Sequence, residues 1–199
     1  GNFNNEIGMP LSLVNMPIDT KVCILELGMN NKGEIKKLTK IASPTISIIT
    51  NIGLAHVGNF NEPKDIAKEK AYIYDSLNEE SFALIPNDSP YSKLLIKRAS
   101  SKIKNIVLFG IKESSNSSFK KITENKFIFS IFGKKISLTK KNYFKHWEEN
   151  TLIILIILNI LKFNFVDFKK SIENLRPLDG RGKKKKIFKN KKSFFLIDE

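Results

Sequence analysis

Short apolar runs that end at Gly or Asn alternate with helix-like segments through the first 110 residues of the chain. The runs at 21–27 and 45–50 are almost continuously apolar and end at Gly28 and Asn51, which is typical of strands buried on both faces. Apolar residues at helical spacing, or a Pro at the first position, predict helices between such runs. The expected helices are 33–41, 62–77 and 89–99, and the further strands are 82–86 and 106–109. This alternation predicts the α/β class, with a mostly parallel sheet and helices on both faces.

The pattern changes after Gly110. A polar loop is expected at 114–118, and two β-type runs around Gly133 predict an antiparallel hairpin or meander. The expected elements of this half are strands 126–132 and 135–138, helices 149–162 and 166–175, and strands 185–188 and 193–197. We therefore predict one α/β domain over residues 1–199 with a small antiparallel β excursion.

The size of the chain suits an ordinary globular protein. Its 199 residues (22.7 kDa) are 41% hydrophobic and 27% charged, a composition that excludes disorder and disulfide scaffolds. The longest apolar run, 152–161, falls short of the ~18 residues that cross a bilayer. No signal peptide is visible, and the lone Cys23 cannot form an internal disulfide, so we expect a cytoplasmic protein. A monomer is also expected.

The net charge of +14 raises the possibility of a basic module that binds nucleic acid. Only 3 of the 34 basic residues are Arg, however, and the chain also holds 28 Ile and 20 Asn, residues that A- and T-rich codons encode. Arg is the usual residue for base-edge and bidentate phosphate recognition. We therefore attribute the excess of Lys to compositional bias, and interpret the run 183–186 as a solvated strand edge or turn rather than a nucleic-acid site.

Polar side chains follow three predicted strands at the edge where open α/β sheets bind ligands. Glu26 ends the first strand, Asn51 and His56 follow the second, and Asn87 and Asp88 follow the third. A carboxylate and an imidazole suit a divalent cation. Taken alone, Glu26 could equally be a helix-terminal or surface group, and His56 could be an ordinary loop histidine.

Four segments resemble, in order and spacing, the central domain of the Mur ligase family. They are GNFNNEIGMPLSL (1–13), ELGMNNKGEI (26–35), TNIGLAHVGNF (50–60) and IAKEKAYIY (66–74). The resemblance returns at Asn150, at PLDGR (177–181) and at Asp198 and Glu199. The first and third segments are most similar to the branch of the family that adds a dipeptide.

This resemblance implies an ATP-dependent ligase that forms an amide bond in peptidoglycan precursor synthesis, with ATP and Mg²⁺ as cofactors. Its partners would be UDP-N-acetylmuramoyl-tripeptide and D-Ala-D-Ala, and neither a specific nucleic acid nor a membrane span is expected. ATP would phosphorylate the tripeptide carboxylate, and the dipeptide amine would attack the acyl phosphate. Such a reaction depends on cationic stabilisation of the transferring phosphoryl group.

The family's site residues carry over to particular positions. By resemblance, Glu26 and His56 bind magnesium, and Lys70 is the family's carbamylated lysine, which helps to place a second magnesium ion. Without the resemblance, Lys70 would be read as a solvated lysine on a basic helix. The resemblance also implies nucleotide contacts at Asn150, Arg181 and Asp198, and a substrate-facing role for Asn4, Asn5 and Asn51.

The chain also departs from the family pattern. The family's phosphate loop, Gly-Lys-Thr or Gly-Lys-Ser at a helix start, does not occur in these 199 residues. We therefore expect residues 1–199 to be a central domain truncated at its N-terminus, with the junction to a further domain beginning near 176–199. The family's His-Asn pair is His146-Trp147 here, which weakens the transfer of an adenine contact to Asn150.

Three classes of function stay open from the sequence. The first is the dipeptide-adding ligase. The second is another ligase of the same fold, such as the diaminopimelate- or lysine-adding enzyme, folylpolyglutamate synthase or cyanophycin synthetase. The third, suggested only by charge, is a basic module that binds nucleic acid.

Overall fold

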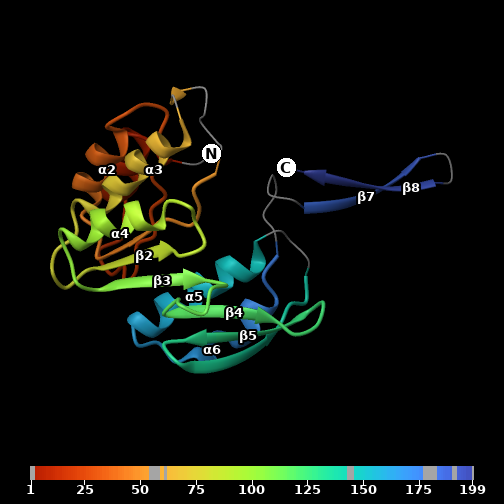
Figure 1. Cartoon of the computed structure of the whole chain (residues 1–199). Coiled ribbons are helices and arrows are strands. Elements are labelled where there is room, and N and C mark those ends of the chain that lie inside the picture. Colours follow the sequence, from red (N-terminus) through yellow and green to blue (C-terminus); the bar gives the residue numbers. More distant parts are fainter. Residues whose placement is uncertain are drawn as a thin grey trace. The chain divides into compact units, whose positions relative to one another are not determined.

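The computed structural model describes residues 3–53, 59–60, 62–142, 146–176, 183–189 and 192–198, the last two ranges as backbone only. The chain forms two compact units, Gly1–Phe109 and Gly110–Glu199, which we describe separately (Figure 1). The interpretation of residues 1–199 as one central domain stays a prediction.

The first unit is built around a parallel sheet. Strand β2 (Phe82–Pro86) pairs in parallel with β1 (Ile46–Ile48) on one side and with β3 (Ile106–Gly110) on the other. The helices of this unit are α1 (Gly8–Val14), α2 (Glu34–Ala42), α3 (Pro63–Ala71) and α4 (Ser92–Ser100), and a 3-10 turn at Tyr72–Tyr74 continues α3. From α2 to β3, helices and strands alternate along the chain as the sequence predicts, whereas no strand separates α1 from α2.

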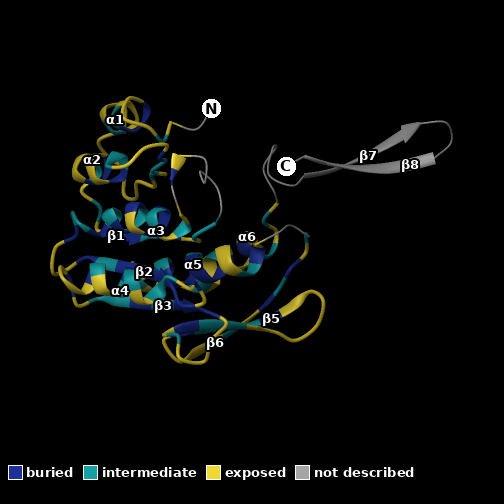
Figure 2. Cartoon of the chain, turned by 45° about the horizontal axis from the view of Figure 1, so that its top comes forward, coloured by how far each residue is buried: buried dark blue, intermediate teal, exposed yellow. Residues whose placement is uncertain are grey.

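The core of the first unit lies between β2 and the helices α3 and α4. Ala83 and Ile85 of β2 pack in one cluster with Leu95 and Ala99 of α4 and with Tyr74. Tyr74 is fully buried, and its hydroxyl donates a 3.1 Å hydrogen bond to the Leu84 carbonyl oxygen. Figure 2 shows the buried residues concentrated along β2. A rigid core therefore supports the loops that follow the strands.

The prediction of a strand at 21–27 is wrong. The segment forms no strand, and the side chains of Val22 and Ile24 are 46% and 89% exposed. A strand needs a neighbour for its backbone hydrogen bonds. Among the described residues, β1 pairs with β2 alone, so no strand partners this apolar run.

Helix α1 and strand β4 (Ser117–Lys121) were not predicted. Part of the expected polar loop at 114–118 lies in β4, which pairs antiparallel with β5 (Lys126–Ile131). The reason is tertiary: Ser117 is buried opposite Ile131, and the Phe119 ring lies 6.0 Å from that of Phe129.

The second unit contains the antiparallel excursion. Strand β5 pairs with β4 and with β6 (Lys134–Thr139), and helices α5 (Trp147–Ile160) and α6 (Phe165–Glu173) follow. Trp147 is fully buried, with its ring 5.5 Å from Phe127. Strands β7 (Lys183–Lys189) and β8 (Lys192–Asp198) form a separate antiparallel pair. The predicted α/β class with an antiparallel excursion is confirmed. None of the helices in the described residues is long and apolar enough to cross a membrane.

Candidate functional site

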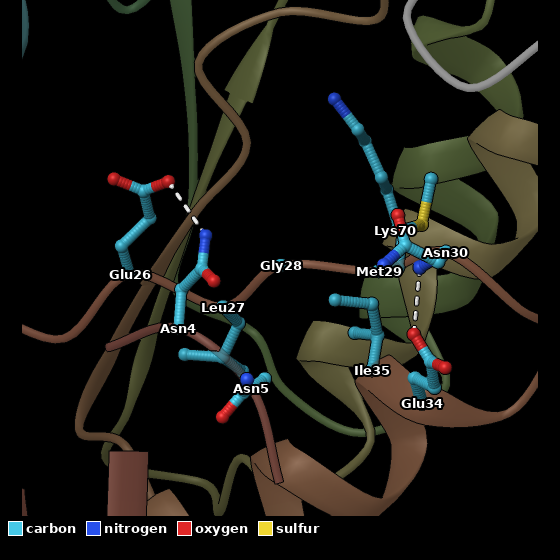
Figure 3. A pocket seen from close by; sticks show the side chains of 10 residues that line it. All are labelled: Asn4, Asn5, Glu26, Leu27, Gly28, Met29, Asn30, Glu34, Ile35 and Lys70. Carbon is cyan, nitrogen blue, oxygen red and sulfur yellow. Dashed lines mark hydrogen bonds between the residues drawn. The ribbon is translucent and has the colours of Figure 1, made fainter. Parts of the chain in front are cut away.

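A pocket of about 260 Å³ lies in the first unit (Figure 3). Four pieces of chain line it: the loop before α1, the segment 26–30, the start of α2, and Lys70 on α3. Its apolar wall includes Met29 and Ile35, which belong to a buried cluster with Phe60 and Ile66. The pocket therefore rests on a packed cluster and carries polar groups at its rim.

Asn4 and Glu26 meet at the rim of this pocket. The Asn4 amide donates a 3.2 Å hydrogen bond to Glu26 Oε1, and the Asn4 carbonyl accepts one of 2.8 Å from the Gly28 amide (Figure 3). A Cβ atom on Gly28 would lie 2.7 Å from Asn4 Nδ2, so a larger residue at this position would displace the Asn4 side chain. The sequence Glu-Leu-Gly thus places an exposed carboxylate beside Asn4.

Asn5 has a local structural task. Its side-chain oxygen accepts hydrogen bonds from the amides of Ile7 (3.1 Å) and Gly8 (2.8 Å), which lie at the start of α1. Because the first amides of a helix lack partners within it, this cap begins α1. The loop that carries Asn4 is thereby joined firmly to the helix.

Lys70 is half-buried on α3 and reaches the segment after β1. Its ammonium group donates a 3.0 Å hydrogen bond to the backbone carbonyl of Asn51. Burial lowers the pKa of Lys70, since it disfavours the charged form. A lysine with a lowered pKa presents more of the neutral amine that carbamylation requires.

Two glutamates of this region, Glu34 and Glu69, were not among the residues predicted from the sequence. Glu34 accepts hydrogen bonds from the Asn30 amide (2.6 Å) and from Asn31 Nδ2 (2.8 Å), and these contacts hold its pKa below the ordinary value. Glu69 is 3% exposed and binds the amides of Gly33 and Ile35. The sequence does not indicate that Glu69 is buried, because it lies among the lysines of α3. Its burial depends on the packing of α3 against α2.

The structure brings some of the predicted residues together. Asn4, Asn5, Glu26 and Lys70 all line the pocket, and Asn51 contacts Lys70 through its backbone. Asn87 is buried after β2, and Asp88 beside it is exposed, but neither lines the pocket.

The remaining predicted residues lie outside the described residues or in the second unit. His56 and Arg181 lie outside the described residues, and of Asp198 only the backbone, at the end of β8, is described. Asn150 is exposed in the first turn of α5, in the second unit. Trp147, the residue that departs from the expected His-Asn pair, is a core residue packed on Phe127 and Phe129.

The donor atoms of this region determine whether it suits a divalent cation. Within the described ranges, no three His, Cys, Asp or Glu side chains gather in a way that could hold a metal. Glu26 nevertheless offers an exposed carboxylate, the hard oxygen ligand that Mg²⁺ prefers, oriented by Asn4. The donor chemistry present fits a magnesium ion that also takes ligands from water and substrate phosphate.

The parallel βα architecture is shared with a known class of protein. Residues 1–158 match the model of the Mur ligase middle domain, and the chain belongs to the Mur ligase family.

Several of the similar proteins in this family are named as D-alanyl-D-alanine ligases. A UDP-N-acetylmuramoyl-tripeptide–D-alanyl-D-alanine ligase from Rickettsia prowazekii is 32% identical over 188 residues, which cover 92% of this chain and 42% of the relative. The crystal structure of MurF from Acinetobacter baumannii superposes with a TM-score of 0.86 at 25% identity, over all of this chain and 43% of that one. A MurF ligase from Thermotoga maritima in complex with ADP has a TM-score of 0.75 at 25% identity, over 93% and 43% of the two chains. The chain thus spans less than half the length of these relatives.

Proposed function

We propose that residues 1–199 form the central, nucleotide-handling part of a ligase that joins D-Ala-D-Ala to UDP-N-acetylmuramoyl-tripeptide. The observation that carries the proposal is the pocket: four residues that the family pattern selects, Asn4, Asn5, Glu26 and Lys70, line one cavity. The names of the similar proteins and the ADP in one of them support the choice of substrates and of ATP.

In the proposed reaction, ATP phosphorylates the terminal carboxylate of the tripeptide. The amine of D-Ala-D-Ala then attacks the acyl phosphate, forming the amide bond and releasing phosphate. Magnesium, held in part by Glu26 and His56, would neutralise charge on the transferring phosphoryl group. Asn4 keeps the Glu26 carboxylate in place for this task.

Lys70 is proposed to act as a carbamate. Its neutral amine would add carbon dioxide and release a proton to become an anionic carbamate, which would help to place a second magnesium ion. Two features favour this role: its pKa is lowered by burial, and Lys70 is one of the residues that line the pocket. Asn5 and Asn51 would face the muramoyl-peptide, whereas Asn150, Arg181 and Asp198 would contact the nucleotide. A cytoplasmic monomer belongs to the same proposal.

The test is a coupled assay on a ligase that contains these 199 residues. We expect ADP release to require both UDP-N-acetylmuramoyl-tripeptide and D-Ala-D-Ala, and mass spectrometry to show their amide-linked product. Diaminopimelate or lysine with the muramoyl-dipeptide, and glutamate with a folate, are the competing substrate pairs. Turnover with one of these pairs and none with D-Ala-D-Ala would assign the chain to another ligase of this fold.

A further inference from the structure

Glu69 is an unusual residue for a helix rich in lysine. It directly precedes Lys70 on α3, and its side chain is buried. Among the described residues of the first unit, it is the single charged residue that is buried. Burying a carboxylate is costly unless hydrogen bonds compensate it.

The compensation comes from the start of α2. Glu69 Oε2 accepts a 2.9 Å hydrogen bond from the Gly33 amide, and Oε1 accepts one of 3.1 Å from the Ile35 amide. These amides belong to the helix end that lacks internal partners and carries partial positive charge. In the part of the chain that the structure describes, no Lys or Arg forms an ion pair with Glu69, so backbone amides balance its charge.

This contact connects two walls of the pocket. Ile35 and Glu34, at the start of α2, line one side, and Lys70, next to Glu69 on α3, lines another. Glu34 in turn holds the Asn30 amide at 2.6 Å. The segment 30–35 is therefore tied internally by Glu34 and tied to the helix of Lys70 by Glu69.

We propose that Glu69 is a positioning residue of the ligase reaction: by binding the Gly33 and Ile35 amides, it fixes the α2 wall of the pocket relative to Lys70. This inference rests on the proposed function. Glu69 touches neither substrate nor metal in this role and acts through the segment that it holds.

Gln at this position tests the idea with little change of volume. A carboxylate accepts hydrogen bonds from both amides. A Gln side chain accepts a hydrogen bond from one of them and turns its own NH₂ group toward the other. Glu69→Gln therefore breaks one of the two ties. The matched control is Glu62→Gln, the same chemical change at an exposed residue just before α3.

The experiment uses the active ligase that contains residues 1–199. For Glu69→Gln we expect kcat to fall at least tenfold, while the KM for ATP changes by less than about threefold and the melting curve stays cooperative. Hydrogen exchange followed by mass spectrometry should show faster exchange in the peptide covering 29–36 and unchanged exchange in the peptide covering β2. Glu62→Gln should match the parent in all these measurements.

A folded Glu69→Gln enzyme with the parent's kcat overturns the inference and gives Glu69 a purely structural role. If this variant does not fold, Glu69→Asp decides, because it keeps the charge but is too short to reach both amides. A folded Glu69→Asp enzyme with reduced kcat supports the inference, and one with normal kcat overturns it. A parent protein without dipeptide-dependent turnover contradicts the proposed function itself, whereas an active parent beside an equally active variant contradicts only the role of Glu69.

Discussion

Lys70 shows how much of a residue's role depends on its surroundings. In the sequence it is one of several lysines on a basic helix, yet in the structure its Nζ atom lies 3.0 Å from the Asn51 carbonyl oxygen. Lys68, two positions earlier, is exposed and pairs with Asp65 at 2.7 Å. Only Lys70 lines the pocket, so the two lysines differ in environment although they share a helix.

Replacement of Lys70 tests its role. In a ligase that contains this chain, we expect Lys70→Ala to abolish turnover and to leave the fold intact, because the carbamate is lost while the core is untouched. Small carboxylic acids should restore part of the activity by occupying the place of the carbamate. Steady-state kinetics with and without added acid, together with a melting curve, measure both effects.

Lys64 and Lys68 provide the controls for this measurement. Both are exposed, so Lys64→Ala and Lys68→Ala should change stability by no more than about 0.5 kcal/mol and activity very little. Near-normal turnover of Lys70→Ala at saturating ATP and magnesium would mean that the family's role does not apply to this residue.

At the scale of elements, α2 supports the pocket through its buried face. Ile35 and Leu38 are 3% and 0% exposed, whereas Ile41, in the last turn of the helix, is 50% exposed. The helix begins at the site and continues into the core. Its packing therefore determines where the polar groups at its start are held.

Two substitutions in α2 compare the loss of stability at a buried apolar residue with the loss at a half-exposed one. We expect Leu38→Ala to lower the free energy of unfolding by about 2 to 5 kcal/mol, since it leaves a cavity in a fully packed site. Ile41→Ala, at a half-exposed position in the last turn, should cost less than about 1 kcal/mol. Urea denaturation followed by circular dichroism gives both values. An equal loss of unfolding free energy in the two variants would show that Leu38 is not part of the core.

At the scale of the whole molecule, the chain spans less than half the length of the relatives that it matches. It spans 42% of its Rickettsia prowazekii relative, and its sequence contains no Gly-Lys-Thr or Gly-Lys-Ser phosphate loop. In other nucleotide-binding proteins, such a loop binds the triphosphate through backbone amides and a lysine.

From this we expect the 199-residue chain alone to have no ligase activity and at most feeble affinity for ATP. Isothermal titration calorimetry with ATP and magnesium is the direct measurement. Micromolar binding would show that another part of this chain holds the triphosphate. The full ligase, measured in parallel, should bind ATP and serves as the positive control.

The sequence by itself determined the class of the fold and most of its elements, because hydrophobic periodicity and Gly, Asn and Pro at segment ends are local signals. The strand at 82–86 and the helix near 33–41 were predicted almost to the residue. Family motifs in the sequence also indicated Asn4, Glu26 and Lys70 as candidate site residues, and all three line the pocket.

Only the tertiary structure decided what depends on partners distant in the sequence. The apolar run 21–27 forms no strand because strand formation requires a paired neighbour, and the polar residues 117–118 lie in one because β5 pairs with them. The burial of Glu69 and the pocket itself arise from contacts between segments more than 20 residues apart. Such contacts leave no periodic trace in the sequence, since they depend on how helices pack together and not on local preference.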